Sequence, residues 1–376
     1  METLTGLDCL IRDAFRPLAG AKVGLITNHT GLTLEGVSAI DAFHHAPGLD
    51  LVRLFSPEHG IRGLLDEKVS DSVDDRTGLP IVSLYGTRQR PAPEHLKGLD
   101  TLVFDIQDIG CRYYTYISTL GNCLEEAARA GLRFVVLDRP NPIGGTAVEG
   151  PISDDDQRSF MAWHPMPVRH GMTVGEIARF FNQERAIGAN LTVIRVEGWE
   201  RRQWLDQTGL YWTNPSPNMR SLTQAALYPG VGLLETTNLS VGRGTDTPFE
   251  MVGAPWLDGR AFAMAMNRQG LPGVRFVPVR FVPRSSVFSG ERCVGVNILI
   301  VDRARFSPVR TGIAMAAALR SAYPSQWKAE AYGRLLANRQ IHQLLLAGAS
   351  PNQMELSWRE GLERFKARRR RYLLYA

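Results

Sequence analysis

The sequence predicts an α/β protein: a doubly wound parallel sheet followed by a smaller α/β domain. In the first half, short apolar runs alternate with helical patterns, as in parallel βαβ units. Several of these runs end at an acidic or amide side chain, where the ligands of such sheets collect. At 376 residues the chain is also too long for one ordinary core, so two domains are expected.

The first domain is expected to contain six strands, at residues 22–28, 51–55, 81–85, 102–106, 134–137 and 191–196. Helices are expected within 33–46 and at 118–130, where apolar residues recur at helical spacing and Gly131 is a natural C-cap. A further helix begins after Thr173, because Thr173 and Glu176 form a capping box.

The segment 212–229 predicts an ordered loop leading into a short helix, and the domain boundary is placed at its end, giving domains 1–228 and 229–376. In the second domain we expect strands at 274–282 and 293–301 and helices at 308–323, around 341–345 and from Ser350-Pro351, a cap followed by an N1 proline. The first strand is followed by Asn28-His29-Thr30-Gly31 rather than G-x-G-x-x-G. The Rossmann-like topology therefore implies no nucleotide site.

Composition is that of a globular protein, with 44% hydrophobic and 22% charged residues. No apolar run reaches the ~18 residues of a membrane helix, and the N-terminus lacks a secretory pattern. We therefore expect a cytoplasmic protein, or a periplasmic or secreted one whose leader was removed. The four cysteines form no C-x-x-C and predict buried, reduced thiols. The basic cluster 366–371 predicts a solvated helix end rather than a nucleic-acid site.

The most informative stretch is 51–63, an apolar strand that stops at Ser56-Pro57 because proline has no N–H for the sheet. Glu58 and His59 follow directly on a turn, with Arg62 close by. His59 either orients a neighbour or is structural. In a doubly wound sheet, Glu58 would share one edge with strand-end residues that include Asp105 and Asp108.

A second glutamate, Glu149, is also predicted on a turn, and paired carboxylates perform acid–base chemistry on glycosidic bonds. His170 precedes the helix capped by Thr173, where the helix dipole lowers a histidine pKa and favours anions. His342 lies among leucines, which is more typical of a core histidine.

Three polar clusters indicate a polar substrate. Residues 111–116 supply hydroxyls and aromatic faces, 214–218 hold amide side chains on a stiff loop, and 235–246 include Arg243, which can bind a carboxylate bidentately. Convergence of Glu58, His59 and the aspartates on a metal is an alternative, but no compact ligand spacing supports it. We therefore expect neither a metal nor a cofactor.

Six ordered motifs together resemble the exo-β-N-acetylmuramidase family (NamZ-like, formerly a domain-of-unknown-function family). They are SPEHGIRG, FDIQDIGCRYYTY, LDRPNPIGG with VEGP, HGMTVGE, NPSPNMRS and ETTNLSVGRGTD. The resemblance implies a Rossmann-like N-terminal domain without nucleotide and a smaller C-terminal domain that closes the cleft. It also implies release of terminal N-acetylmuramic acid from the non-reducing end of peptidoglycan fragments. Glu58 would be the leading catalytic residue, Glu149 the second acid, and His170 and His342 residues of the cleft.

The resulting hypothesis is that Glu58 is the general acid, with Glu149 and His170 as further catalytic residues. Glu149 would be nucleophile, base, or the group that orients the 2-acetamido oxygen. Arg62, Arg112 or Arg243 would bind the lactyl carboxylate. The predicted substrate-binding residues are His59, Arg62, Asp105, Asp108, Arg112, Tyr114, Asn141, Asn214, Asn218, Glu235, Asn238, Arg243, Asp246 and His342. The alternatives are a non-catalytic cell-wall sugar-binding protein and a metal-dependent hydrolase, and the oligomeric state is left open.

Overall fold

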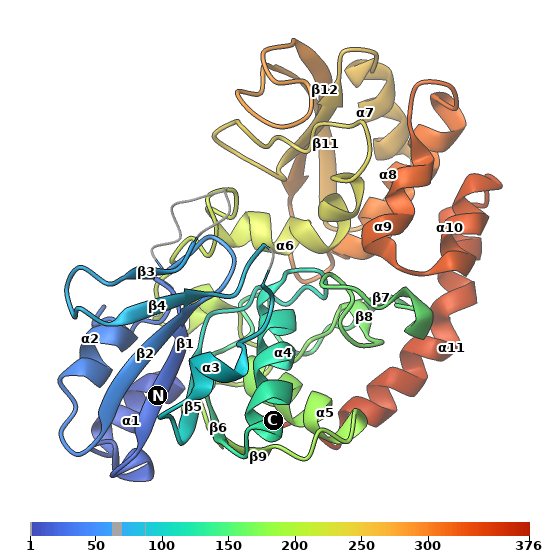
Figure 1. Cartoon of the computed structure of the whole chain (residues 1–376). Coiled ribbons are helices and arrows are strands. Elements are labelled where there is room, and N and C mark those ends of the chain that lie inside the picture. Colours follow the sequence, from blue (N-terminus) through green and yellow to red (C-terminus); the bar gives the residue numbers. More distant parts are fainter. Residues whose placement is uncertain (1, 62–69, 87) are drawn as a thin grey trace.

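The computed structural model describes residues 2–61, 70–86 and 88–376. It consists of a sheet with helices on both faces and a smaller domain that lies above one end of it (Figure 1). The larger sheet is mostly parallel and the smaller domain contains an antiparallel sheet, which confirms the predicted α/β class.

Over the described residues, the larger sheet has seven strands in the order β3-β4-β2-β1-β5-β6-β9, of which only the edge strand β3 runs antiparallel to its neighbour. These strands are β1 Lys22–Thr27, β2 Asp50–Ser56, β3 Ser72–Val73, β4 Pro80–Ser83, β5 Thr101–Asp105, β6 Arg133–Leu137 and β9 Asn190–Ile194. The chain winds outward from β1 through β2 to β4, and then from β5 through β6 to β9. The switch point of the doubly wound sheet therefore lies between β1 and β5.

Helices cover both faces of this sheet. On one face lie α1 Gly6–Arg12 and α2 Ala39–His44, and on the other α3 Pro93–Leu96, α4 Tyr116–Arg129 and α5 Val174–Glu184. The capping box predicted for α5 is confirmed, because Thr173 Oγ1 accepts from the Glu176 N–H and the Glu176 carboxylate accepts from the Thr173 N–H. The predicted 118–130 helix begins two residues earlier, at Tyr116.

The C-terminal domain has a sheet in the order β10-β12-β11. Its strands are β10 Met251–Ala254, β11 Val274–Phe281 and β12 Cys293–Ile300, and the helices are α6 Leu222–Val231, α7 Gly259–Arg268, α8 Pro308–Ala322, α9 Gly333–Leu336, α10 Arg339–Leu346 and α11 Pro351–Arg369. A separate hairpin pairs β7 Glu149–Ile152 with β8 Pro167–Arg169. Five short 3-10 helices complete the described structure: η1 Arg16–Leu18, η2 Asp155–Gln157, η3 Leu205–Gln207, η4 Gly232–Leu234 and η5 Ala329–Tyr332.

Helix α6 spans the predicted domain boundary at residue 228 and packs tightly against α8. A Cβ added at Gly230 would lie 1.9 Å from the Pro308 carbonyl oxygen, and one at Gly312 would lie 2.3 Å from the Gly230 oxygen. Glycine is therefore required at this crossing because the two backbones almost touch. The hydrophobic cluster on the α4 and α5 face of the sheet continues through α6 into the C-terminal domain, so both domains share one core.

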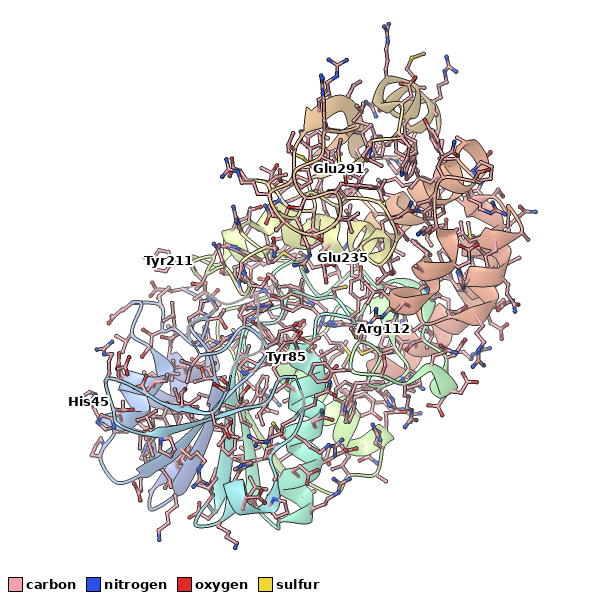
Figure 2. The ribbon with its side chains drawn as sticks, turned by 45° about the horizontal axis from the view of Figure 1, so that its top comes forward. His45, Tyr85, Arg112, Tyr211, Glu235 and Glu291 are labelled. Atoms are coloured by element: carbon pink, nitrogen blue, oxygen red, sulfur yellow. The ribbon has the colours of Figure 1, made fainter. Side chains whose placement is uncertain are left out.

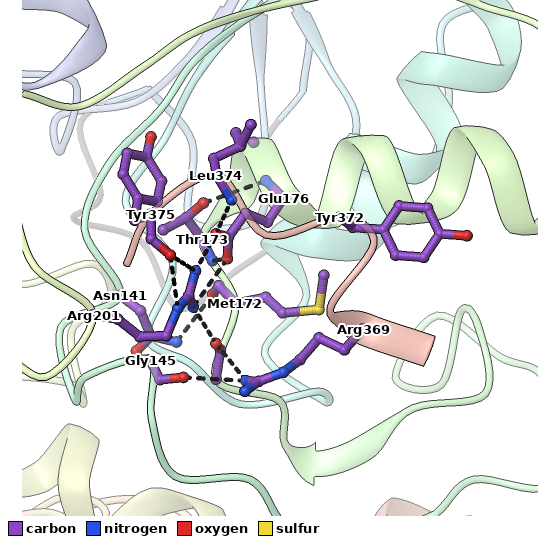
Figure 3. Close-up of polar contacts among 12 residues, drawn as sticks. Asn141, Gly145, Met172, Thr173, Glu176, Arg201, Arg369, Tyr372, Leu374 and Tyr375 are labelled. Carbon is purple, nitrogen blue, oxygen red and sulfur yellow. Dashed lines mark hydrogen bonds and ion pairs between the residues drawn. The ribbon is translucent and has the colours of Figure 1, made fainter. Parts of the chain in front are cut away.

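Helix α11 returns from the C-terminal domain along the N-terminal domain (Figure 1). At its end, the Arg369 guanidinium is buried and donates to the carbonyls of Gly145 at 3.1 Å, His170 at 3.2 Å and Gly171 at 2.8 Å (Figure 3). Burial lowers the pKa of Arg369 to about 10. The prediction of a solvated basic helix end was wrong for this residue, because Arg369 binds carbonyls far away in the sequence.

The cysteines were predicted to be buried thiols, and Cys9, Cys111, Cys123 and Cys293 are buried and free. Over the described residues, no helix combines the length and apolar composition that a bilayer crossing needs.

Candidate active site

A cavity of about 460 Å³ lies between the carboxyl edge of the large sheet and the C-terminal domain. Side chains from both domains line it. They are Glu58, His59, Tyr113, Tyr114, Thr115, Tyr116, Met161, Ser216, Met219, Tyr228, Glu235, Thr236, Thr237, Arg243, Phe249, Val287, Arg334 and Leu335. This volume falls within the range of small-molecule sites.

Glu58 reaches the cavity from a tight turn directly after β2. The Gly60 N–H donates to the Pro57 carbonyl at 3.1 Å, which closes the turn, and His59 has φ 69° at its third position. A positive φ at this position is the usual place of glycine in a type II turn, so histidine is strained there. Such strain is typical of functional sites. Both Glu58 and His59, which lie on this turn, line the cavity.

Thr115 holds the Glu58 carboxylate. Its hydroxyl Oγ1 donates a short hydrogen bond to Glu58 Oε2. Thr115 stands at the N-cap position of α4, but its side chain makes no capping hydrogen bond. The hydroxyl that would ordinarily cap the helix therefore fixes the orientation of the Glu58 carboxylate, which comes from the turn after β2.

Aromatic rings form much of the wall. The Tyr114 ring stands almost perpendicular to those of Tyr116 and Tyr228, with centroids 5.0 and 5.9 Å away. The Tyr113 hydroxyl donates to the Tyr228 carbonyl at 2.7 Å and fixes this group. Burial raises the pKa of Tyr114, so its hydroxyl stays neutral and can donate a hydrogen bond. Neutral aromatic side chains of this kind pack well against a sugar ring.

The C-terminal part of the chain contributes charges. Arg243 Nε lies 2.5 Å from Glu235 Oε1, and both side chains are about a quarter exposed at 24% and 22%. Arg334, on α9, lines the same cavity and is exposed. Figure 2 places Glu235 at the level where the two domains meet.

His29 follows the end of β1 and lies near His59, on the turn after β2. Its Nε2 is 2.6 Å from the Asn214 carbonyl oxygen, so that nitrogen carries the proton and donates. Burial lowers the pKa of His29, and the nearby His59 lowers it further. His29 is therefore a neutral ring that ties the 214–218 loop to the sheet edge.

The switch point itself is closed by an ion pair. Arg139 Nε and Nη2 donate to Asp105 Oδ1 and Oδ2 at 2.5 and 2.9 Å, and both side chains are buried. The remaining space, which Thr30 and Gln107 help to line, is about 30 Å³, roughly the volume of one water molecule. Asp105 was predicted to bind substrate, and this is corrected: it neutralises Arg139 inside the sheet edge.

Asp108 and His170 form a buried pair that does not line the cavity. His170 Nδ1 accepts from the Met172 N–H at 3.1 Å, which places its proton on Nε2, 3.4 Å from Asp108 Oδ2. Asp108 Oδ2 also accepts from the Gly110 N–H at 2.7 Å. Both residues were predicted at the site, but His170 is fully buried and has no direct access to a ligand there.

Glu149 is also held away from the cavity. It begins strand β7 rather than lying on a turn, and its carboxylate accepts from Arg169 Nη1 at 2.7 Å, from the Ser307 hydroxyl and from the Val309 N–H at 3.4 Å. Glu149 therefore joins the β7–β8 hairpin to the start of α8. Its predicted role as the second catalytic acid does not fit this position.

Four other predicted binding residues contact backbone carbonyls and do not line the cavity: Arg112, Asn141, Asn238 and His342. Asn141 donates to the Met172 carbonyl at 3.0 Å, and Asn238 donates to the Gln326 carbonyl at 2.7 Å. His342 Nε2 lies 3.1 Å from the Ala329 carbonyl oxygen. Local sequence could not reveal these roles, because every partner is distant in the sequence or in another element.

Arg112 is buried at 1% exposure and donates from Nη2 to the Leu335 and Leu336 carbonyls at 3.0 and 2.8 Å. It was predicted to bind substrate, but it instead fastens α9 to the N-terminal domain, at the junction seen in Figure 2. Burial lowers the pKa of Arg112 to about 10.

Three of the remaining predicted residues do not line the cavity. Asn214 and Asp246 are exposed and Asn218 is buried, and none of the three lines the cavity. Arg62 lies outside the described residues. Glu58 and His59 line the cavity, whereas Asp105 and Asp108 do not. The described side chains show no group of three or more suited to a metal ion.

Sequence reasoning missed several cavity residues. Thr115, Ser216, Thr236 and Thr237 lie within the predicted polar clusters but were not named individually as binding residues, and Arg334 lies outside these clusters. Only the hydroxyl in CRYYTY was a usable signal for Thr115. The local sequence gives no indication that Arg334 lines the cavity, because its position there depends on how the domains pack.

The fold and the cavity define a class: a two-domain α/β protein that places a turn-borne glutamate and an aromatic wall at its domain junction, suited to a sugar and to acid catalysis. A family model described as "Exo-beta-N-acetylmuramidase NamZ, N-terminal" matches residues 23–223, and the corresponding C-terminal model matches residues 226–375. The chain therefore belongs to the exo-β-N-acetylmuramidase NamZ family.

Comparison with individual relatives supports this family assignment. The chain is 40% identical to "Peptidoglycan beta-N-acetylmuramidase NamZ" of Bacillus subtilis (strain 168), over 99% of this chain and 91% of the relative. Its structure resembles crystal structures of two DUF1343 family proteins from Bacteroides fragilis NCTC 9343. The first has a TM-score of 0.87 at 37% identity, and the second 0.79 at 28%; each comparison covers 100% of this chain and 99% of the other.

Proposed function

We propose that this protein is an exo-acting glycosidase that releases terminal N-acetylmuramic acid from the non-reducing end of peptidoglycan fragments. Membership of the NamZ family and 40% identity to a peptidoglycan β-N-acetylmuramidase support this activity. The observation that carries the proposal is a strained turn that directs Glu58 into a cavity with an aromatic wall.

Glu58 is the general acid in this proposal. The Thr115 hydroxyl occupies Oε2, so Oε1 is the oxygen that carries the proton to the leaving glycosidic oxygen. The C1–O bond then breaks, the 4-hydroxyl of the next sugar departs with that proton, and positive charge develops at C1.

The substrate's own 2-acetamido oxygen is the proposed nucleophile. Glu149 is bound to Arg169 away from the cavity, and Glu235, a second carboxylate of the cavity, is bound to Arg243. Attack of the acetamido oxygen on C1 gives a cyclic intermediate, which water opens while Glu58 takes up the water proton. This route retains the β configuration.

The domains have distinct roles in the proposal. Residues up to 228 supply the acid and most of the aromatic wall, and residues after 228 close the cleft with Glu235, Arg243 and Arg334. We infer that the ligand is a small carbohydrate, such as a disaccharide or muropeptide fragment, bound between the domains.

The test is incubation with a muramic acid–glucosamine disaccharide, comparing the wild type with Glu58→Gln. We expect free N-acetylmuramic acid from the wild type and a kcat lowered by about 10²–10⁴-fold in the variant, because glutamine cannot donate the proton. A chelator is included, since loss of activity would indicate a metal-dependent hydrolase. Sugar binding without any released product would indicate a binding protein, and full activity of Glu58→Gln would refute the acid assignment.

Proton NMR of the product tests the second step. The β-anomer should appear first and then mutarotate. Initial release of the α-anomer would show an inverting attack by water and would exclude the acetamido route.

A further inference from the structure

The cavity contains two arginines in different electrostatic states. Arg243 is compensated, because its Nε lies 2.5 Å from Glu235 and its guanidinium also packs 5.6 Å from the Phe249 ring centroid. Arg334 lines the same cavity and is exposed, and the described part of the chain gives it no carboxylate partner. An anionic substrate group requires a cation that a carboxylate of the cavity does not already neutralise.

The backbone that carries Arg334 is bound to the N-terminal domain and to the loop that follows η4. The buried Arg112 donates to the carbonyls of Leu335 and Leu336, the two residues that follow Arg334. The Thr236 hydroxyl donates to the Ala331 carbonyl at 2.7 Å, three residues before it. The Arg334 Cα is therefore held on both sides, although its side chain is exposed. A side chain whose backbone is held in place, and whose guanidinium has no carboxylate partner among the described residues, suits recognition of a carboxylate.

We propose that Arg334 binds the carboxylate of the 3-O-lactyl group and so selects N-acetylmuramic acid over N-acetylglucosamine. This inference rests on the proposed function, because the lactyl group belongs to its substrate. It also reassigns a role that sequence reasoning gave to Arg62, Arg112 or Arg243. Arg112 is enclosed beneath α9, and Arg243 is occupied by Glu235.

The experiment compares 4-nitrophenyl N-acetyl-β-muraminide with its lactyl methyl ester, which lacks the negative charge and is larger by one methyl group. The wild type, Arg334→Ala, Arg334→Lys and Arg359→Ala are assayed; Arg359 is an exposed arginine of α11 that serves as the control for loss of one positive charge. We expect the wild type to prefer the acid by about 10–100-fold in kcat/KM, as for loss of a charged hydrogen bond. Arg334→Ala should treat acid and ester alike, Arg334→Lys should regain part of the preference, and Arg359→Ala should match the wild type.

Two outcomes would overturn the inference: an Arg334→Ala enzyme that keeps the wild-type preference, or one that loses activity equally on both compounds. Calorimetric binding of free N-acetylmuramic acid separates this inference from the proposed function. If the wild type cleaves neither glycoside but binds the sugar, and Arg334→Ala does not, the activity is refuted while the carboxylate contact stands. Equal affinity of both proteins for the sugar, or binding to neither, refutes the contact.

Discussion

Replacing Glu149 with glutamine tests whether the second conspicuous glutamate is chemical or structural. The Arg169 side chain is 5% exposed and Glu149 is 17% exposed, so the substitution leaves a buried guanidinium without its counter-charge. Breaking a buried ion pair costs about 3–5 kcal/mol. Glutamine keeps an acceptor oxygen, and Arg169 retains its bond to the Ile143 carbonyl at 2.6 Å. We therefore expect the lower end of the range, about 3 kcal/mol.

The assay has two parts. Thermal unfolding should show Tm lowered by about 6–12 °C, taking about 2–4 °C per kcal/mol for a domain of roughly 150–250 residues. The kcat on a muraminide glycoside, measured well below Tm, should stay within about twofold of the wild type, because the carboxylate does not line the cavity.

Glu355→Gln is the matched control. It removes the charge from a surface pair with Arg310, whose side chains are 35% and 39% exposed, so its cost should be below about 1 kcal/mol. A Glu149→Gln enzyme with normal Tm and a kcat reduced a hundredfold or more would refute the structural reading and restore Glu149 as a catalytic residue.

Two further predictions concern Thr115 and Asp138. Thr115→Val should lower kcat about tenfold because Glu58 loses its hydroxyl donor; Thr115→Ser should stay near the wild type, and an equal loss in both would contradict the role of the hydroxyl. Burial raises the pKa of Asp138 to about 6, so the native state keeps this proton after the unfolded chain, with a pKa near 3.9, has released it. The stabilising contribution is complete below about pH 4 and is lost as pH rises through about 6, a change of about 3 kcal/mol. Denaturant unfolding from pH 4 to 7 should show the wild type losing this much stability relative to Asp138→Asn, and parallel curves for the two proteins would refute it.

Local sequence patterns were sufficient for much of the fold. Proline at 57 ended β2 where expected, and Thr173 with Glu176 marked the start of α5, because a strand end and a helix cap each depend on a few adjacent residues. The end of β2 also placed Glu58 in the cavity. Short-range patterns thus predicted most strands of the sheet and the position of Glu58 at its edge, whereas the family resemblance made Glu58 the leading catalytic candidate.

Long-range contacts explain the rest. Glu149 resembled a displayed carboxylate because glycine and proline flank it, but Arg169 neutralises it from a strand twenty residues later. Thr115 occupies an N-cap position, and only the folded chain shows that its hydroxyl serves Glu58 instead. In the sequence Arg334 has no feature that distinguishes it from other surface arginines, and only the position of α9 shows that it lines the cavity. In each case the deciding partner comes from another element.

The segment after α11 completes the hydrogen bonding of two carboxylates in the first domain. The Tyr375 hydroxyl donates to Asp138 Oδ2 at 2.5 Å, and the Leu374 N–H donates to the Glu176 carboxylate at 2.8 Å. These acceptors lie in the first domain. Figure 3 shows that the contacts of Glu176 lie close to those of Arg369. During synthesis the N-terminal segments leave the ribosome first. Asp138 and Glu176 therefore lack part of their hydrogen bonding until residues 369–375 have emerged, long after the strands of the first domain have left the ribosome.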